Sequence, residues 1–355
     1  MLFVAPLIVK EERNVDMKSK VTMQDIADRL NLSKNSVSQA LSGKDGVSEE
    51  TRRKIMRAAD EMGYVYTLGK KKKAVTDSKG AIALIASEFA FSQKNFFGEI
   101  YLTIEQEAAK YGKRLLIQSV TREAAESLAL PSFLTEDDVD GVMVLSHITT
   151  DYINRVIDTK IPTVLIDHHH PRIQADCILT NNRFSAYEAI RHLVELGHTR
   201  IGFLGDISIS PSYYERLEGF RLAMRDFGIT PRDSWLCTDT AEDAGSVMSR
   251  VQSLDEQPTA WFCVNDGLGF FLNAALQQLG YQIPADVSIV SFDNGYLSRL
   301  STPPTTTLDV DLKLFGVKAV EQLFKRIQEP GEPYTELLLP TKLLVRESTA
   351  AAPEA

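Results

Sequence analysis

The sequence is poor in cysteine and has no long apolar run. Only three of its 355 residues are cysteines, Cys177, Cys237 and Cys263, and no short spacing joins them. This argues against a disulfide framework or a cysteine-rich zinc site and favours a reducing cytoplasm. No apolar stretch approaches the roughly 18 residues that a membrane-spanning helix needs. With 44% hydrophobic and 25% charged residues, the chain is typical of a globular protein of two or three domains.

Catalytic motifs are also missing. No Gly-x-Gly-x-x-Gly segment follows a predicted strand, and no Gly-x-Ser-x-Gly turn is present. Residues 63–70 only approach a phosphate-binding loop, because five residues instead of four separate the glycines and no Ser or Thr follows the lysine. We therefore expect neither an enzyme nor a bound cofactor.

Positive charge is scarce overall but concentrated near the N-terminus. The formal net charge is −9, yet residues 17–79 contain 14 Lys and Arg against 8 Asp and Glu, whereas residues 80–355 contain 23 against 37. A small basic head on a large acidic body is typical of a DNA-binding module joined to a separate sensing domain. A basic surface that is merely solvated is the alternative explanation.

Three short amphipathic helices are predicted in the basic head. Thr22 and Asp25 form a capping-box pattern before the first helix, and Ser33 and Ser48 can cap the second and third. Gly63 is a stop signal after the third helix. Only two residues separate the first two helices, which predicts a helix-turn-helix whose second helix enters the major groove of DNA.

The second helix of this motif offers side chains that can read bases. Lysine can donate to guanine, and asparagine and glutamine can each form two hydrogen bonds with adenine. Hydroxyl groups nearby suit phosphate contacts, which position a protein without specifying a sequence. A three-helix domain with a solvated polar face is the alternative. The predicted base-reading residues are Lys34, Asn35 and Gln39, and the predicted phosphate contacts are Thr22, Ser33, Ser36 and Ser38.

The segments D-I-A, S-x-x-S-V-S, V-S-x-x-T-R and G-Y occur in this order within residues 21–64, and their spacing needs no insertion or deletion. In this order they resemble the headpiece of the LacI/GalR family of bacterial transcription regulators. The resemblance implies docking of the second helix in the major groove. Gln39 stands where the family usually has Arg, so we expect a different operator sequence with the same docking mode.

The linker after the headpiece departs from the family pattern N-x-x-A-R-x-L. By the resemblance, a short helix here inserts a Leu from each subunit into the minor groove, but Lys73 stands at that position. We expect Lys70, Lys71, Lys72 and Lys73 to contact phosphates, which makes DNA binding sensitive to salt. They supply no apolar wedge, and a flexible charged linker is an equally weighted alternative.

Short apolar runs alternate with helical patterns from Gly80 onward. Such alternation predicts an α/β fold, with parallel sheets covered by helices on both faces, and about ten strands suit two lobes better than one sheet. The expected strands are residues 81–87, 114–119, 141–146, 162–167, 175–180, 200–205, 259–264, 287–292 and 305–309. The expected helices are residues 95–111, 183–196, 213–227, 266–279 and 311–328.

The body contains four further family motifs: N-F-F-G-E-I at 95–100, H-L-x-x-x-G-H-x-x-I-G at 192–202, R-L-E-G-F at 216–220 and I-P-x-x-V-S-I-V-x-F-D at 283–293. The resemblance therefore covers nearly the whole chain. It implies the fold of periplasmic sugar-binding proteins, with three crossovers between two lobes. Lobe one is then residues 80–177 and 309–337, and lobe two is residues 178–308 and 338–347.

Polar and aromatic residues gather at the expected strand ends, where open α/β sheets bind ligands. Arginine offers a planar fork of donors, aspartate and asparagine are acceptors, and an aromatic face can lie against a sugar ring. The resemblance implies effector contacts at these positions, although each residue also has a plainer role as core aromatic, loop cap or helix start. The predicted effector contacts are Phe96, Phe97, Asp167, His168, Arg216, Asn265 and Asp293.

His168, His169 and His170 are consecutive. They cannot all face one metal on a strand, because successive side chains alternate. We expect no metal site here, with His168 lining the cleft and the other two in a solvated turn.

Together these features predict a cytoplasmic, homodimeric transcription regulator, interpreted as a repressor, that reads a near-palindromic DNA operator. A small molecule, interpreted as a sugar or sugar derivative, would bind between the lobes and control operator affinity. Two alternatives stay open: control by a phosphorylated carrier protein as corepressor, and a solute-binding protein without DNA binding. The predicted parts are a disordered extension (1–16), the headpiece (17–64), a hinge (65–79), the bilobed effector and dimerisation domain (80–347) and a disordered tail (348–355).

Overall fold

The structure of the protein is a computed structural model, and the chain in it folds as two compact units, Met1–Asp77 and Ser78–Ala355. It describes residues 21–41, 46–62, 64, 80–88, 90, 94–136, 138–145 and 148–354, without the side chains of Glu49, Asp60, Lys94, Asn95 and Phe96. The predicted extension at residues 1–16 and the hinge, with its phosphate contacts Lys70 to Lys73, lie outside the described residues.

The N-terminal unit contains the three predicted helices, α1 (Met23–Leu30), α2 (Lys34–Leu41) and α3 (Glu49–Glu61). The capping box of α1 is confirmed, since Asp25 N donates to Thr22 Oγ1 and Thr22 N donates to Asp25 Oδ2 at 2.6 Å. Ser33 and Ser48 accept hydrogen bonds of 3.0 and 3.3 Å from backbone N–H groups three residues later. The apolar faces meet in one small core of Ile26, Ala27, Val37, Ala40, Leu41, Ile55, Ala58 and Ala59.

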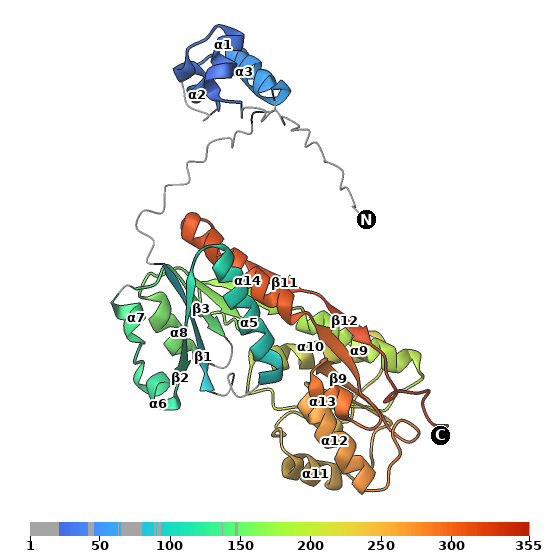
Figure 1. Ribbon diagram of the computed structural model, residues 1–355. Coiled ribbons are helices and arrows are strands. Elements are labelled where there is room, and N and C mark those ends of the chain that lie inside the picture. The colour runs from blue at the N-terminus through green and yellow to red at the C-terminus, as the bar shows by residue number, and fades with distance from the viewer. Residues whose placement is uncertain are drawn as a thin grey trace, which may run out of the picture. The chain divides into compact units, whose positions relative to one another are not determined.

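The larger unit is built on two six-stranded sheets, each at the centre of one lobe (Figure 1). In lobe one the strand order is β11-β5-β4-β3-β1-β2, and in lobe two it is β12-β10-β9-β8-β6-β7. Every pairing is parallel except that of β12 with β10. The strands of lobe one are β1 (Ala81–Ser87), β2 (Arg114–Val120), β3 (Val142–Leu145), β4 (Thr163–Ile166), β5 (Asp176–Thr180) and β11 (Glu336–Leu339). Those of lobe two are β6 (Ile201–Leu204), β7 (Leu236–Cys237), β8 (Ala260–Cys263), β9 (Ser288–Asp293), β10 (Thr306–Val310) and β12 (Thr341–Leu344).

Helices cover both sheets, which explains why β1, β3, β4 and β8 are apolar along most of their length. In lobe one, α14 (red in Figure 1) runs alongside α5, and in lobe two α9 packs against α10. The helices of lobe one are α5 (Lys94–Lys110), α6 (Arg122–Ser127), α7 (Ser132–Thr135), α8 (Thr150–Ile157) and α14 (Leu312–Gln328). Those of lobe two are α9 (Asn182–Glu195), α10 (Pro211–Asp226), α11 (Ala244–Gln252), α12 (Asp266–Gln278) and α13 (Tyr296–Leu300), with a short 3-10 helix η1 (Asp233–Trp235).

The chain crosses between the lobes three times, after β5, after β10 and between β11 and β12. The predicted lobe boundaries are therefore wrong by a few residues, because they cut through β5, β10 and β11, each of which belongs whole to one sheet. The sequence prediction also missed β7, β11 and β12. These strands lie at sheet edges, where half-exposed side chains give a weak apolar signal.

The predicted disordered tail is also wrong for most of its length. Ser348 is fully buried, and its backbone O accepts a hydrogen bond of 2.8 Å from Ile289 N of β9. Further along, Ala350 O lies 3.1 Å from the buried ring of His198, and Ala352 N donates to Leu196 O at 2.8 Å. The segment has few apolar side chains, so its order comes from backbone groups that complete lobe two.

Candidate functional site

The first candidate site is the N-terminal half of α2. Lys34 and Asn35 are exposed in its first turn, as the prediction requires of base-reading residues. Gln39 is half-buried one turn later, and its side-chain amide lies against Gly46. All three residues are on α2, so the predicted recognition helix has the polar face that a major-groove contact needs. The base contacts themselves stay a prediction.

The hydroxyls predicted to contact phosphate are largely engaged in the helix caps. Thr22 Oγ1 donates to Asp25 Oδ2 at 2.7 Å, so its hydroxyl is engaged in the cap of α1, and its phosphate contact stays a prediction. The hydroxyls of Ser33 and Ser36 lie 2.8 Å apart, which leaves one donor between them for a phosphate. Ser38 is half-buried on the same helix.

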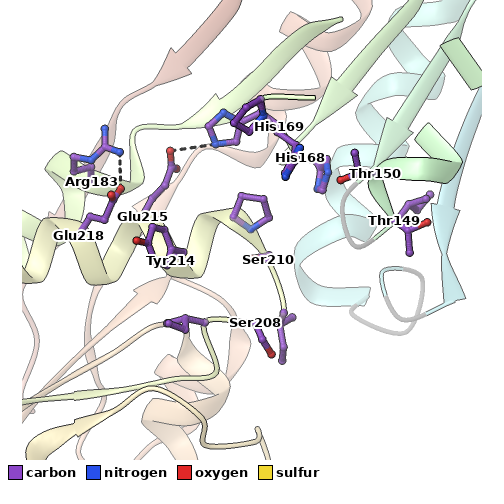
Figure 2. A pocket seen from close by; sticks show the side chains of 16 residues that line it. Thr149, Thr150, His168, His169, Arg183, Ser208, Ser210, Tyr214, Glu215 and Glu218 are labelled. Carbon is purple, nitrogen blue, oxygen red and sulfur yellow. Dashed lines mark hydrogen bonds and ion pairs between the residues drawn. The ribbon is translucent and has the colours of Figure 1, made fainter. Parts of the chain in front are cut away.

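The second candidate site lies between the two lobes, where two cavities open. The larger, of about 680 Å³, is lined by His168, His169 and His170 of lobe one and by Tyr214 and Glu215 of α10, among others (Figure 2). The smaller, of about 280 Å³, is lined by Glu99 of α5 and by residues that follow β8 and β9 in lobe two. Both are thus bounded by side chains from both lobes, as expected at the carboxyl ends of parallel strands.

Arg216 is the most enclosed of the predicted contacts, with 2% of its surface exposed. Its guanidinium carbon lies 3.6 Å from the ring centroid of Phe292. Nη1 donates to Val264 O, Nε donates to Asn182 Oδ1 at 3.0 Å, and Nη2 lies 3.3 Å from Asp293 Oδ1. A buried charge needs such partners to be tolerated, so Arg216 is rigidly held before any ligand arrives.

Two aspartates flank this arginine. Asp167, at the end of β4 in lobe one, is 6% exposed and accepts a hydrogen bond of 2.8 Å from Ser212 Oγ of lobe two. Burial raises the pKa of Asp167 to about 6, although the charge of Arg216 and the Ser212 hydrogen bond act in the opposite direction. Burial likewise raises the pKa of Asp293 against the effect of Arg216, and Asp293 lines the smaller cavity.

Asn265 caps α12 and also faces the smaller cavity. Its Oδ1 accepts a hydrogen bond of 2.9 Å from Leu268 N, so its role as a helix start is real. Its Nδ2 donates to Tyr213 Oη at 2.7 Å and to Glu242 Oε2 at 2.6 Å. The other oxygen of Glu242 lies where a Cβ on Gly267 would stand, which explains the glycine in the first turn of α12. Asn265 therefore holds Glu242 at the cavity wall.

The structure describes the side chain of only one of the two predicted aromatic contacts, Phe96 and Phe97. Phe97 is 5% exposed and belongs to the hydrophobic core, which is the plainer role that the sequence also allowed, and its contact with an effector stays a prediction. The side chain of Phe96 lies outside the described residues. His168 lines the larger cavity, at the position expected of it.

Several cavity residues escaped the sequence prediction. His169 was expected in a solvated turn, yet its Nε2 lies 3.2 Å from Glu215 Oε1. Glu242, Asn182 and Tyr213 hold the predicted residues but belong to no motif. Asn182 lies two residues after an expected strand, Tyr213 lies one helical turn before Arg216 on the same face, and Glu215 is next to Arg216 in the sequence. Closeness to a strand end or to Arg216 was therefore the available signal. Among the described residues, no cluster of His, Cys, Asp or Glu could hold a metal ion.

The folds of the two units and their candidate sites are typical of one class of protein, in which a helix-turn-helix headpiece is joined to a bilobed ligand-binding body. Comparison with known proteins agrees with this class. The profile of "Bacterial regulatory proteins, lacI family" matches residues 22–66, and that of a "Periplasmic binding protein-like domain" matches residues 190–349.

Whole relatives match over nearly the full length. The chain is 30% identical to the ribose operon repressor of Haemophilus influenzae, over 92% of this chain and 98% of that protein. It is 30% identical to the transcriptional regulator DegA of Bacillus subtilis, over 93% and 98%. The solved structure of a CelR–cellobiose complex aligns with a TM-score of 0.67 at 25% identity, over 92% of this chain and 99% of the other.

The chain belongs to the LacI family of bacterial regulatory proteins. It is a ligand-controlled, DNA-binding transcription repressor and not an enzyme. Within the described parts of the chain, no helix has the length and apolar character needed to cross a membrane.

Proposed function

We propose that the protein is a cytoplasmic, homodimeric repressor that binds a near-palindromic operator through Lys34, Asn35 and Gln39. Its affinity for the operator falls or rises when a sugar or sugar derivative binds between the lobes. The observation that carries the proposal is the buried pair Arg216–Asp293 beside a cavity that both lobes line. A two-fold protein matches a two-fold DNA site, which supports the palindromic operator.

The chemistry of the cavity supports a polyhydroxylated ligand. Asp293, Asn265 and Glu242 line this cavity with carboxylate oxygens and one amide group. Arg216 does not line the cavity itself, but its guanidinium lies 3.3 Å from Asp293 and holds that carboxylate in place. Hydroxyl groups both donate and accept, so a sugar can satisfy such a mixed wall. The cellobiose bound to CelR and the name of the ribose operon repressor agree with a sugar as the class of ligand.

Lobe orientation is the element through which the ligand would act. The hydrogen bond from Ser212 to Asp167 already joins the lobes across the cleft. A ligand that binds one orientation better shifts the population toward it, and the effect on DNA binding is reciprocal, typically about 1–3 kcal/mol. A ligand that weakens operator binding must therefore bind the DNA-loaded protein more weakly.

The test is fluorescence anisotropy of the purified full chain on the DNA upstream of its own gene, over a salt series and with a panel of sugars. We expect tight, salt-sensitive binding that one sugar changes by about 5-fold or more. Binding that no sugar alters would count against the effector class. Binding no better than that of random DNA, repeated after selection from a random DNA pool, would contradict the proposal as a whole. A response to a phosphorylated carrier protein in place of sugars would favour the corepressor alternative.

A further inference from the structure

A continuous path of polar contacts joins lobe one to the buried arginine of lobe two. Nε2 of His169, in the loop after β4, lies 3.2 Å from Oε1 of Glu215 on α10. Oε2 of Glu215 accepts a hydrogen bond of 3.0 Å from Asn182 Nδ2, and Asn182 Oδ1 accepts one of 3.0 Å from Arg216 Nε. Arg216 Nη2 faces Asp293. We call this path, from His169 through Glu215, Asn182 and Arg216 to Asp293, the inter-lobe relay.

The relay has a protected centre and two accessible ends. Asn182 and Arg216 are 1% and 2% exposed, so their contacts are shielded from water and are strong. At one end, His169 lines the larger cavity, where Figure 2 shows its ring turned toward Glu215. At the other end, Asp293 lines the smaller cavity. A change at either cavity therefore meets the same chain of contacts.

Only the first contact of the relay crosses between the lobes. His169 belongs to lobe one, whereas Glu215 and the remaining members belong to lobe two. A rotation that moves the loop after β4 away from α10 would break this contact. The bond from Ser212 to Asp167 also crosses, but it pairs a hydroxyl with a carboxyl and lies outside the relay.

We infer that His169 is a positioning residue of the regulatory switch: its contact with Glu215 holds the lobes in one relative orientation and, through Asn182, fixes the guanidinium of Arg216. The inference rests on the proposed function, because it links lobe orientation to operator binding. It goes beyond that function by naming an inter-lobe contact that connects the wall of the larger cavity, through Arg216, to Asp293 in the wall of the smaller one.

The inter-lobe contact depends on protonation. The pKa of His169 is raised, chiefly by its hydrogen bond to Glu215 and further by the charge of Glu336 on β11, against the effect of burial. The imidazolium form is therefore favoured when the contact is made. The contact is strong below the raised pKa and weakens as the pH rises through it. The other titratable or charged groups on the same cavity wall are His168, His170, Arg183 and Glu218.

The experiment measures the lobe orientation directly, without a ligand. Spin labels are attached to Glu126→Cys on α6 and Gln252→Cys on α11 of the full chain, both exposed positions. The three natural cysteines are buried and do not compete for label. Labelled protein is diluted with unlabelled protein, and the distance distribution is recorded at about pH 6 and about pH 9.

We expect a narrow distribution at the lower pH that broadens or shifts at the higher pH. His169→Ala should be broad at both values. His169→Gln keeps a donor near the Nε2 position but does not ionise, so it should stay narrow at both. Asp226→Asn, which alters the exposed pair with Arg225 at the far end of α10 and lines neither cavity, is the matched control and should behave like the unchanged protein.

Operator affinity of the same variants gives the functional readout. His169→Ala should change operator affinity by about 5-fold or more at the lower pH, and His169→Gln should remove its pH dependence. Identical distance distributions for His169→Ala and the unchanged protein would overturn the inference. So would altered distances with unaltered operator affinity. An unchanged protein that bound no operator would contradict the proposed function itself, whereas the distances test the relay separately.

Discussion

At the scale of single residues, Arg216 joins stability to the proposed function. It is enclosed by Phe292, Asn182 and Asp293, so it lies beside a buried carboxylate and holds Asp293, which lines the smaller cavity, in place. Removing one partner of a buried ion pair leaves an uncompensated charge, which is more costly than losing the pair's net attraction.

Replacing Arg216 with alanine should therefore abolish the ligand response and lower the free energy of unfolding by about 3–5 kcal/mol. Operator binding without ligand should survive, since the headpiece is a separate unit. Urea unfolding and operator anisotropy measure the two effects. Arg216→Lys, which keeps the charge without the fork, guards against a variant that fails to fold, and Arg225→Ala is an exposed control on the same helix. A normal ligand response in Arg216→Lys would remove the two-point role of the guanidinium.

Asp167 gives a pH dependence of known sign. Its pKa rises from 3.8 to about 6 on folding, so its contribution to stability is present below 3.8 and is lost as the pH rises through about 6. Relative to Asp167→Asn, the unchanged protein should lose about 3 kcal/mol of unfolding free energy between about pH 3.5 and about pH 7. Urea titrations of both proteins across this range measure the difference. A constant difference would show that the pKa of Asp167 is the same in the folded and the unfolded chain.

At the scale of secondary-structure elements, the site depends on how closely α9 and α10 approach. A Cβ on Gly219 of α10 would lie 2.0 Å from the backbone O of Arg183 on α9. This contact brings Asn182, at the start of α9, within reach of Arg216 and Glu215 on α10. The glycine in the R-L-E-G-F motif thus has a packing role.

Gly219→Ala should lower the free energy of unfolding by about 2 kcal/mol, because a backbone atom cannot move aside cheaply. Alanine's better helix propensity, about 1 kcal/mol, offsets only part of the strain. Gly98→Ala on α5 is the control: an added Cβ there meets none of the described atoms within 4 Å, so the change should be neutral or stabilising. Thermal or urea unfolding of the two variants measures this difference. Equal stabilities of Gly219→Ala and Gly98→Ala would mean that the α9–α10 contact is not tight.

At the scale of the whole molecule, DNA binding and ligand binding are assigned to two parts of the chain with opposite net charge. The basic head suits DNA and the acidic body does not, so contacts with phosphate should be confined to the N-terminal part of the chain. The cavities, by contrast, are built wholly within the body.

Neutralising Lys70 to Lys73 should reduce the salt dependence of operator binding. Each phosphate contact that is lost should lower the slope of log affinity against log salt by about 0.9. Anisotropy over a salt series measures the slope, and Lys318 and Lys325 on α14 of the body, changed in the same way, are the control. If the slope is unchanged, these lysines make no contact with DNA phosphates and belong to a charged linker that only faces solvent.

Much of the fold was predictable because its signals are local. The caps Thr22, Ser33 and Ser48 and the alternation of apolar strands with amphipathic helices were read directly from neighbouring residues. The edge strand β11 and the tail around Ser348 were not, because their order comes from partners more than forty residues away along the chain. The burial of Phe97 could not be predicted for a related reason: an aromatic residue in the first turns of a helix gives the same sequence pattern whether it faces a ligand or the core.

The sequence by itself determined the class of protein, the headpiece helices, the α/β character of the body and the positions of Arg216, Asn265 and Asp293, since each depends on residues close together in the chain. Only the tertiary structure decided which side chains meet. It brought His169 of lobe one to Glu215 of lobe two, and Glu242 to Gly267. These contacts arise where separate strands end at one cleft, and the geometry of that cleft is a property of packing that no local pattern encodes.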